Sequence, residues 1–255
     1  MRNTITICRK ELNSYFRSPI AYGVMAFFAL ISGYFFYVAV VYFMQASIQS
    51  SMQGGSQPMS VNDMVIRPLF SNISVIGLFI IPMITMRLFA EEKRTGTFEL
   101  LATSPVKDLE IILGKWLAAV ILYASILALS ALSVITLFAY GKPDWRPILV
   151  GYLGLLLQGG CLLAIGSFIS TCTKNQIVAG VATFSICLLL WVLDWVSSFQ
   201  DSVIAKGVAY LSVLQHFESF SKGVLDAKDV IYYASAIFLG LFLTARSLEA
   251  LRWRS

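Results

Sequence analysis

The sequence predicts an all-α polytopic membrane protein with six transmembrane helices. Hydrophobic residues make up 58% of the 255 residues and charged residues only 13%, whereas a soluble globular domain is roughly 25% charged. Apolar runs near the ~20 residues needed to cross a bilayer recur along the chain. We expect a single transmembrane domain over residues 1–255, with spans at about 20–44, 68–86, 116–139, 148–170, 177–196 and 230–245.

The first element is expected to be an amphipathic helix over residues 3–18 that lies in the membrane interface. Its other faces carry basic residues such as Arg9 and Lys10, and Pro19 is expected to end it. The run at 20–44 is longer than the roughly 7–15 apolar residues of a signal peptide, which predicts a retained span. The apolar face of the first helix consists of Ile5, Cys8, Leu12 and Phe16.

Residues 45–67 are polar and are expected to form a short external loop. The second span contains Pro82, which predicts either a packing kink or a hinge. A tight loop at 140–147 leads into the fourth span, and a short turn at 171–176 follows it. Glycines in the fourth span predict close helix packing. They are Gly151, Gly154 and Gly159 or Gly160.

The fifth span ends in the aromatic girdle Trp191–Trp195. Asp194 within it is either an interfacial acid or a buried functional acid. Residues 197–229 form the longest expected external segment, and their apolar residues would allow short re-entrant helices. The last span, 230–245, covers roughly 24 Å of a ~30 Å apolar core. It therefore stands upright, or residues before Asp229 also enter the membrane.

Basic residues predict the orientation of the spans. If both termini are cytoplasmic, 13 Lys and Arg residues face the cytoplasm and 6 face the outside, which is the asymmetry that membrane proteins show. The net charge of +5 suits anionic lipid headgroups. Basic residues are scattered rather than clustered on one face, so nucleic-acid binding is not expected.

No catalytic, cofactor or metal site is expected in this chain. The Gly-Lys pairs at 114–115 and 141–142 lack the other residues of a GxxxxGK[ST] phosphate loop. Neither GxSxG nor HExxH occurs. His216 is the single histidine, and no partner for it is apparent. Free buried thiols are expected, because no CxxC pair occurs among Cys8, Cys161, Cys172 and Cys187.

Residues 86–116, between the second and third spans, concentrate charge of both signs. Gly96 is a poor helix residue and is expected to end the helix that leaves the membrane, after which Thr97 can cap a new short helix. Ser104 and Pro105 give a second helix-start signal. A solvated charged loop is the alternative, but apolar residues, mixed charges and two helix starts favour a docking element. The candidate docking residues are Glu91, Glu92, Arg94, Gly96, Thr97, Phe98, Glu99 and Leu101.

This stretch resembles the first cytoplasmic loop of ABC-2-type transporter permeases, with the greatest likeness to the gliding-motility and nitrous-oxide-reductase-maturation branch. The likeness covers nearly the whole chain. In that family the loop forms a coupling helix that sits in a cleft on an ATPase subunit, so the resemblance gives these candidate residues a coupling role. It also implies a secondary interface on the N-terminal helix and the 171–176 turn; a lipid-surface anchor is the alternative for that helix. The secondary residues are Arg9, Lys10, Lys174 and Asn175.

The resemblance implies a permease subunit of an ATP-driven exporter in the bacterial cytoplasmic (inner) membrane. Its expected partners are a P-loop ABC ATPase that binds the ATP, a second permease copy or a related permease, and membrane lipids. An auxiliary extracytoplasmic protein is also allowed for. Two other classes stay open: a membrane scaffold whose complex moves no substrate, and an intramembrane enzyme. No polar cluster within the spans identifies a cargo.

Overall fold

The computed structural model describes residues 2–52, 60–97, 106–140, 143–199, 207 and 210–252. Within that part of the chain the fold is helical, and six segments are long and apolar enough to cross a membrane. The predicted all-α polytopic fold is confirmed. The helices are α1 (Arg2–Arg17), α2 (Pro19–Met52), α3 (Arg67–Thr85), α4 (Ala90–Thr95), α6 (Asp108–Tyr140), α7 (Trp145–Cys172), α8 (Gln176–Phe199), α10 (Val213–Ser221) and α11 (Ala227–Arg252), with a π-helical turn at Asn62–Ile66 before α3.

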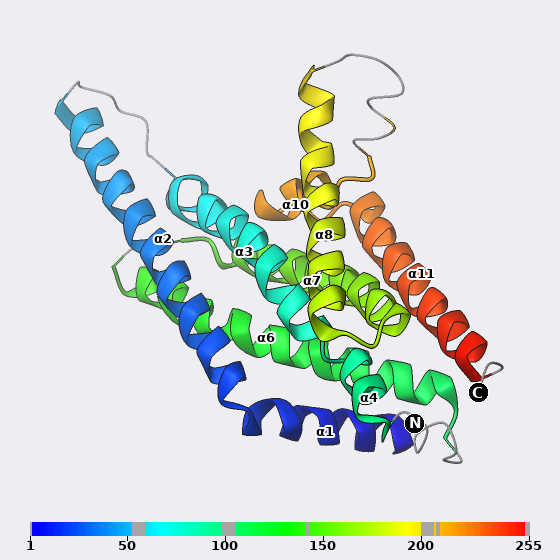
Figure 1. Ribbon diagram of the computed structural model, residues 1–255. Helices are drawn as coiled ribbons and strands as arrows, with labels where there is room; N and C mark the ends of the chain where they lie inside the picture. The colour runs from blue at the N-terminus through cyan, green and yellow to red at the C-terminus, as the bar shows by residue number, and fades with distance from the viewer. Residues whose placement is uncertain are drawn as a thin grey trace.

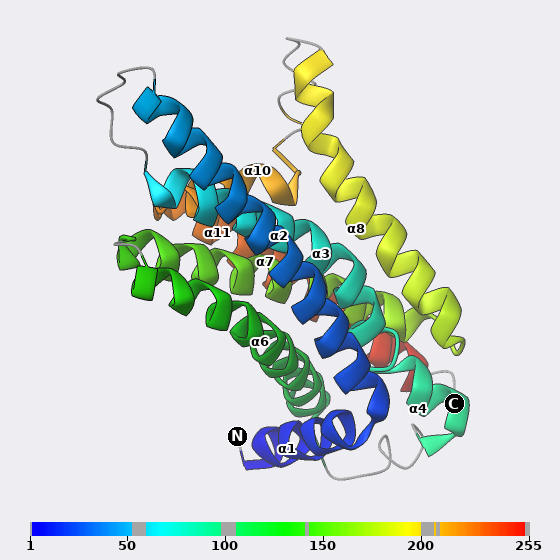
Figure 2. The same ribbon diagram turned by 90° about the vertical axis from the view of Figure 1, so that its left-hand side faces the viewer.

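The short helices lie at the two ends of the bundle formed by the long ones. Figures 1 and 2 show α1 and α4 at one end, near both ends of the chain, whereas α10 lies toward the opposite end. The turn at 173–175, between α7 and α8, belongs to the α1 and α4 end, because α4 contacts both of these helices. We call this the α4 end of the bundle.

Helix α7 forms the centre of the bundle and packs against α3, α6, α8, α10 and α11. Its glycines permit this packing, as predicted. A Cβ added to Gly151 would stand 2.2 Å from the ring of Phe70, and one added to Gly159 would stand 2.1 Å from the ring of Tyr123. Both rings are buried, so larger side chains would force the neighbouring helices apart.

Helices α3 and α7 are mostly buried, whereas few residues of α2 and α8 are buried along their apolar lengths. In water such faces would be unfavourable, but in a bilayer they meet lipid or another membrane protein. Pro82 lies inside α3 and is itself buried. The amide nitrogen of Met86 still donates to its carbonyl oxygen at 3.0 Å, so α3 continues to Thr85.

Three helices extend well beyond the predicted spans: α2, α11 and also α6, which begins at Asp108 rather than near 116. Helix α2 continues to Met52 instead of ending at 44, because polar residues do not break a helix; the Ser51 hydroxyl simply donates to the carbonyl oxygen of Ser47 at 2.9 Å. Helix α11 begins at Ala227 and ends at Arg252, well beyond the expected span 230–245. The 26-residue helix is long enough to cross the apolar core, although the predicted span 230–245 was too short to do so.

His216 has a partner, contrary to the sequence-based interpretation. Its Nδ1 lies 2.7 Å from Oδ1 of Asp229, and its Nε2 lies 2.9 Å from the carbonyl oxygen of Tyr210. The ring also stacks on Tyr232 at 3.8 Å. Both His216 and Asp229 are buried, and together they fasten α10 to the first turn of α11. Asp194 belongs to α8, but its side chain lies outside the described part of the structure.

Candidate functional site at the α4 end

Helix α4 follows α3 after a short turn and ends where the sequence predicts. Gly96 forms its C-terminal cap with φ of 73°, in the left-handed region that favours glycine. The helix therefore ends immediately after Thr95. Beyond the cap, the Thr97 hydroxyl lies 3.0 Å from that of Thr95.

The start of α4 is held by α7 rather than by a capping residue of its own. Phe89 precedes the helix and has no side chain that can accept a hydrogen bond. The amide nitrogens of Phe89 and Ala90 instead donate to Oγ of Ser170, each at 3.1 Å. Lys93 Nζ donates to the carbonyl oxygen of Thr171, one residue further along α7. The end of α7 thereby positions α4.

Lys115 joins three elements at this end of the bundle. Its ammonium nitrogen lies 2.8 Å from Oε1 of Glu92 on α4 and 3.1 Å from Oε1 of Glu11 on α1. It also lies 5.4 Å from the ring centre of Phe89. The side chain is 2% exposed, and a lysine so deeply buried needs compensating anions. We call Lys115, Glu92 and Glu11 the three-helix joint.

Helix α1 packs along the first turns of α6 (Figure 2). A Cβ at Gly114 would stand 2.9 Å from Ile7, which shows how close the two helices are. The expected apolar face is divided in two: Cys8 is buried, but Ile5 is 69% exposed. The protein-facing side of α1 carries Glu11 and Tyr15, and the exposed apolar side chains suit the membrane interface that the amphipathic pattern predicts.

The predicted docking residues do not all lie on one surface. Arg94, Gly96 and Thr97 are exposed, and Glu91 is partly buried without an ion pair to any described residue. Glu92 turns inward to Lys115, so its carboxylate is already engaged within the chain. The other three predicted residues, Phe98, Glu99 and Leu101, lie outside the described residues.

The residues of the predicted secondary interface are exposed at the α4 end. Arg9 and Lys10 are on α1, and Lys174 and Asn175 are in the turn between α7 and α8. The Asn175 side chain is partly committed, because its Oδ1 accepts a hydrogen bond of 2.9 Å from the amide nitrogen of Ile177 and so caps α8.

Sequence reasoning missed the residues that hold this end together: Glu11, Lys115 and Ser170. One signal was present, since Lys115 stands next to Gly114 among apolar residues, where an isolated charge calls for a partner. The partners themselves are 104 and 23 positions away in the sequence, and helical spacing cannot reveal contacts of that kind.

Comparison with known proteins gives two findings. A family model described as "ABC-2 family transporter protein" matches residues 5–243. Two curated proteins, both named "Probable multidrug ABC transporter permease YbhR" and from Escherichia coli strains K12 and O157:H7, are each 26% identical over 163 residues. The alignment covers 63% of this chain and 43% of each relative, so it spans less than half the length of these proteins.

Proposed function

The chain belongs to the ABC-2 family of transporter proteins, and we propose on that premise that it is the transmembrane permease subunit of an ATP-driven exporter. The observation that carries the proposal is the attachment of α4. This short charged helix lies at one end of the bundle, where it is bonded to α6 and α7 and is linked to α1 through Lys115 of α6. An element with exposed polar residues and rigid connections to several long helices is suited to receive force from a partner and pass it into the membrane.

A separate ATPase would supply the energy, since the sequence contains no phosphate loop. The ATPase would bind the α4 end through Glu91, Arg94, Gly96 and Thr97, together with the segment that carries Phe98, Glu99 and Leu101. Arg9, Lys10, Lys174 and Asn175 would form the secondary contact. Glu91 offers an anion to a basic residue of the ATPase, and Phe98 and Leu101 offer apolar anchors of the kind that dominate binding energy.

The three-helix joint gives the proposal a mechanism. When nucleotide binding closes the two ATPase subunits, they displace α4. Because Lys115 links α4 to α1 and α6, and Ser170 links α4 to α7, these helices move with it. The membrane helices would rock between inward- and outward-facing arrangements as packed bodies. A second permease would complete the unit through exposed apolar faces such as those of α2 and α8, and the substrate path would lie between the permeases.

The proposed location is the bacterial cytoplasmic membrane, with both termini and the α4 end in the cytoplasm. The distribution of basic residues supports this orientation. The narrower assignment to the gliding-motility and nitrous-oxide-reductase-maturation branch rests on the resemblance of residues 86–116. A scaffold that moves no cargo is the alternative. ATPase activity that a specific cargo stimulates in the reconstituted complex would support the exporter, and its absence across candidate cargoes would favour the scaffold.

The docking proposal is tested by pull-down of the partner ATPase with chain variants at matched expression. Phe98→Ala should weaken association by about 30-fold, because truncating a buried aromatic anchor costs about 2 kcal/mol or more. Glu91→Ala should cost about 0–1 kcal/mol if its contact is exposed, and several kcal/mol if it is desolvated against an arginine. Lys228→Ala, at the far end of α11 from the α4 end, is the control. Full ATPase binding by both the Phe98 and Glu91 variants would refute docking at this segment.

A further inference from the structure

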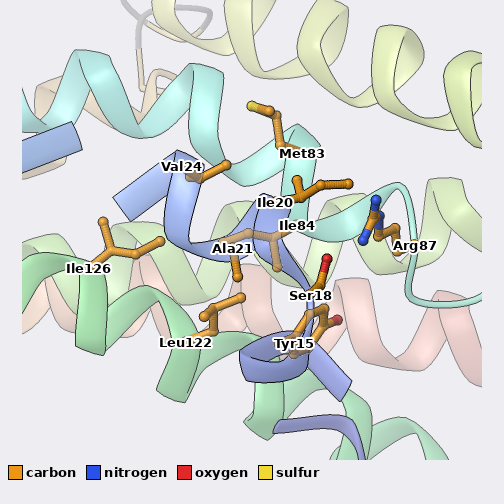
Figure 3. Close-up of a pocket in the computed structure, with 10 residues that line it drawn as sticks. All are labelled: Tyr15, Ser18, Ile20, Ala21, Val24, Met83, Ile84, Arg87, Leu122 and Ile126. Atoms are coloured by element: carbon orange, nitrogen blue, oxygen red, sulfur yellow. The ribbon is translucent and has the colours of Figure 1, made fainter. Parts of the chain in front are cut away.

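A pocket lies where α1 turns into α2, against the end of α3 and the middle of α6 (Figure 3). Apolar side chains from three helices line most of it, including Val24, Ile84 and Leu122. Two further lining residues, Ile20 and Met83, are 48% and 45% exposed. The pocket therefore opens sideways, onto the surface that the hydrocarbon of the bilayer covers.

Three polar side chains gather at one side of this pocket: Tyr15, Ser18 and Arg87 (Figure 3). Tyr15 and Ser18 stand at the end of α1, and Arg87 follows the last turn of α3. Among the described residues, the two hydroxyl groups and the guanidinium have no hydrogen-bonding side-chain or backbone partner, and Arg87 forms no ion pair. These are unused donors on a partly buried surface.

Arg87 forms no ion pair with a described carboxylate, although Glu91 follows it by four residues and acts on the same Tyr15 hydroxyl. Glu11 and Glu92 both contact Lys115 in the three-helix joint, where one ammonium faces two carboxylates. Burial raises the pKa of the Tyr15 hydroxyl, with a smaller contribution from Glu11, so this phenol remains a neutral O–H donor. The polar side of the pocket thus presents one permanent positive charge and two hydroxyl donors.

A phosphodiester fits these groups, because it carries one negative charge and several acceptor oxygens, which arginine and hydroxyl groups bind well. The apolar side suits an acyl chain. The pocket has a volume of about 30 Å³, far below the roughly 300–1,000 Å³ of a pocket for a drug-sized molecule. A ligand that leaves most of its mass in the bilayer does not need more.

We propose that this pocket is a binding site for one anionic phospholipid of the leaflet at the α4 end. The phosphate binds between Arg87, Ser18 and Tyr15, and the first part of an acyl chain lies across Val24 and Met83. The lipid bridges the turn between α1 and α2 to the turn that precedes α4. The proposal does not depend on whether the chain is an exporter.

The test uses the purified full chain in nanodiscs of phosphatidylcholine that contain a small fraction of phosphatidylglycerol with a photoreactive diazirine in one acyl chain. After illumination, peptides that carry the adduct are identified by mass spectrometry. We expect adducts at residues 20–24 and at Met83. The Arg87→Gln variant should be labelled about tenfold less than the wild type, since a charge-assisted hydrogen bond is removed. Arg17→Gln, which removes the same charge from an exposed position on α1, should retain it.

Two further arms separate the alternatives. The same diazirine chain on phosphatidylcholine should label the site several-fold less, because its headgroup has no net charge, and excess inorganic phosphate should not displace the lipid. If Arg87→Gln perturbs folding, Tyr15→Phe and Ser18→Ala each remove only one hydroxyl and should lower labelling about twofold to threefold. Equal labelling by the two lipids, displacement by phosphate, or equal labelling of the Arg87 and Arg17 variants would overturn the proposal.

Discussion

Lys115 Nζ lies 2.8 Å from Oε1 of Glu92, in an ion pair that joins the start of α6 to the middle of α4. Only 2% of the lysine side chain is exposed. A charge pair at this depth adds little stability over an apolar contact, but breaking it leaves an uncompensated charge. We interpret the pair as a device that fixes the position of α4 relative to the membrane helices, which is the property that a coupling element requires.

Lys115→Met should therefore destabilise the chain by about 3–5 kcal/mol, because Glu92 and Glu11 remain partly buried without their cation. Unfolding of the purified chain in detergent measures the effect. Lys10→Met is the matched control, since the Lys10 side chain is 65% exposed and its contact with Glu11 is 3.8 Å long.

Removing the two carboxylates together with the lysine should restore stability. The triple variant Lys115→Met, Glu92→Gln, Glu11→Gln should recover most of the lost stability, because no unpaired charge remains. If the single lysine variant unfolds like the wild type, or if neutralising the two glutamates gives no recovery, Lys115 is not held by this ion pair.

Ser170 should stabilise the start of α4 without affecting the rest of α7. Ser170→Ala removes the oxygen that accepts the amide protons of Phe89 and Ala90, and losing a cap of this kind costs about 1 kcal/mol. Hydrogen exchange at these two amides should accelerate about fivefold while exchange in the middle of α7 is unchanged. Ser167→Ala is the control, because its hydroxyl donates to Leu163 within the same helix. Equal exchange in both variants would show that α4 is fixed by other contacts.

Adjacent glycines in α7 allow a strict test of helix packing. A Cβ at Gly159 would meet the buried ring of Tyr123 at 2.1 Å, whereas one at Gly160 would find its nearest neighbours at 3.5 Å. Gly159→Ala should destabilise the chain by about 1–3 kcal/mol through overpacking, and Gly160→Ala should be nearly neutral. Denaturant unfolding of the two variants side by side gives the comparison. A neutral Gly159 variant would mean that α6 and α7 are less closely packed than the structure indicates.

The sequence predicted the spans and the close-packed glycines because hydropathy and residue size are local properties. It also predicted a helix end at Gly96, where the backbone is left-handed, but it assigned that end to the helix leaving the membrane and did not predict the break between α3 and α4. It did not predict that Glu92 faces inward. A helix of six residues has too few apolar positions to indicate which side is buried, so the orientation of Glu92 depends on where α6 places Lys115.

The other errors have a similar cause. The 45–67 segment was interpreted as a loop from its polarity, yet α2 continues to Met52, because polarity at the end of a span indicates where the membrane stops and not where the helix does. His216 lies 13 positions before Asp229, with irregular chain between them, so no helical period connects the pair. Three docking residues, Phe98, Glu99 and Leu101, lie outside the described part of the chain and stay predictions.

Asp229 should be more important for stability than its neighbour Asp226. Asp229→Ala leaves Nδ1 of the buried His216 without its partner and should cost about 1–3 kcal/mol. Asp226→Ala removes an exposed contact with Lys228 and should cost no more than about 1 kcal/mol. Limited proteolysis at the connection between α8 and α10 should become faster in the first variant only. The same proteolysis rate in the two variants would show that the His216–Asp229 contact does not hold α10 in place.

The orientation of the chain can be tested with a native cysteine. Cys172, at the end of α7, is exposed, whereas Cys8, Cys161 and Cys187 are buried. It precedes the turn at the α4 end, so it should face the cytoplasm with both termini. A membrane-impermeant maleimide should leave Cys172 unlabelled in intact cells and label it in inside-out vesicles. Cys172→Ser should abolish the vesicle signal, which shows that the other thiols do not contribute. Labelling of Cys172 in intact cells would invert the proposed topology and place the α4 end outside, away from ATP.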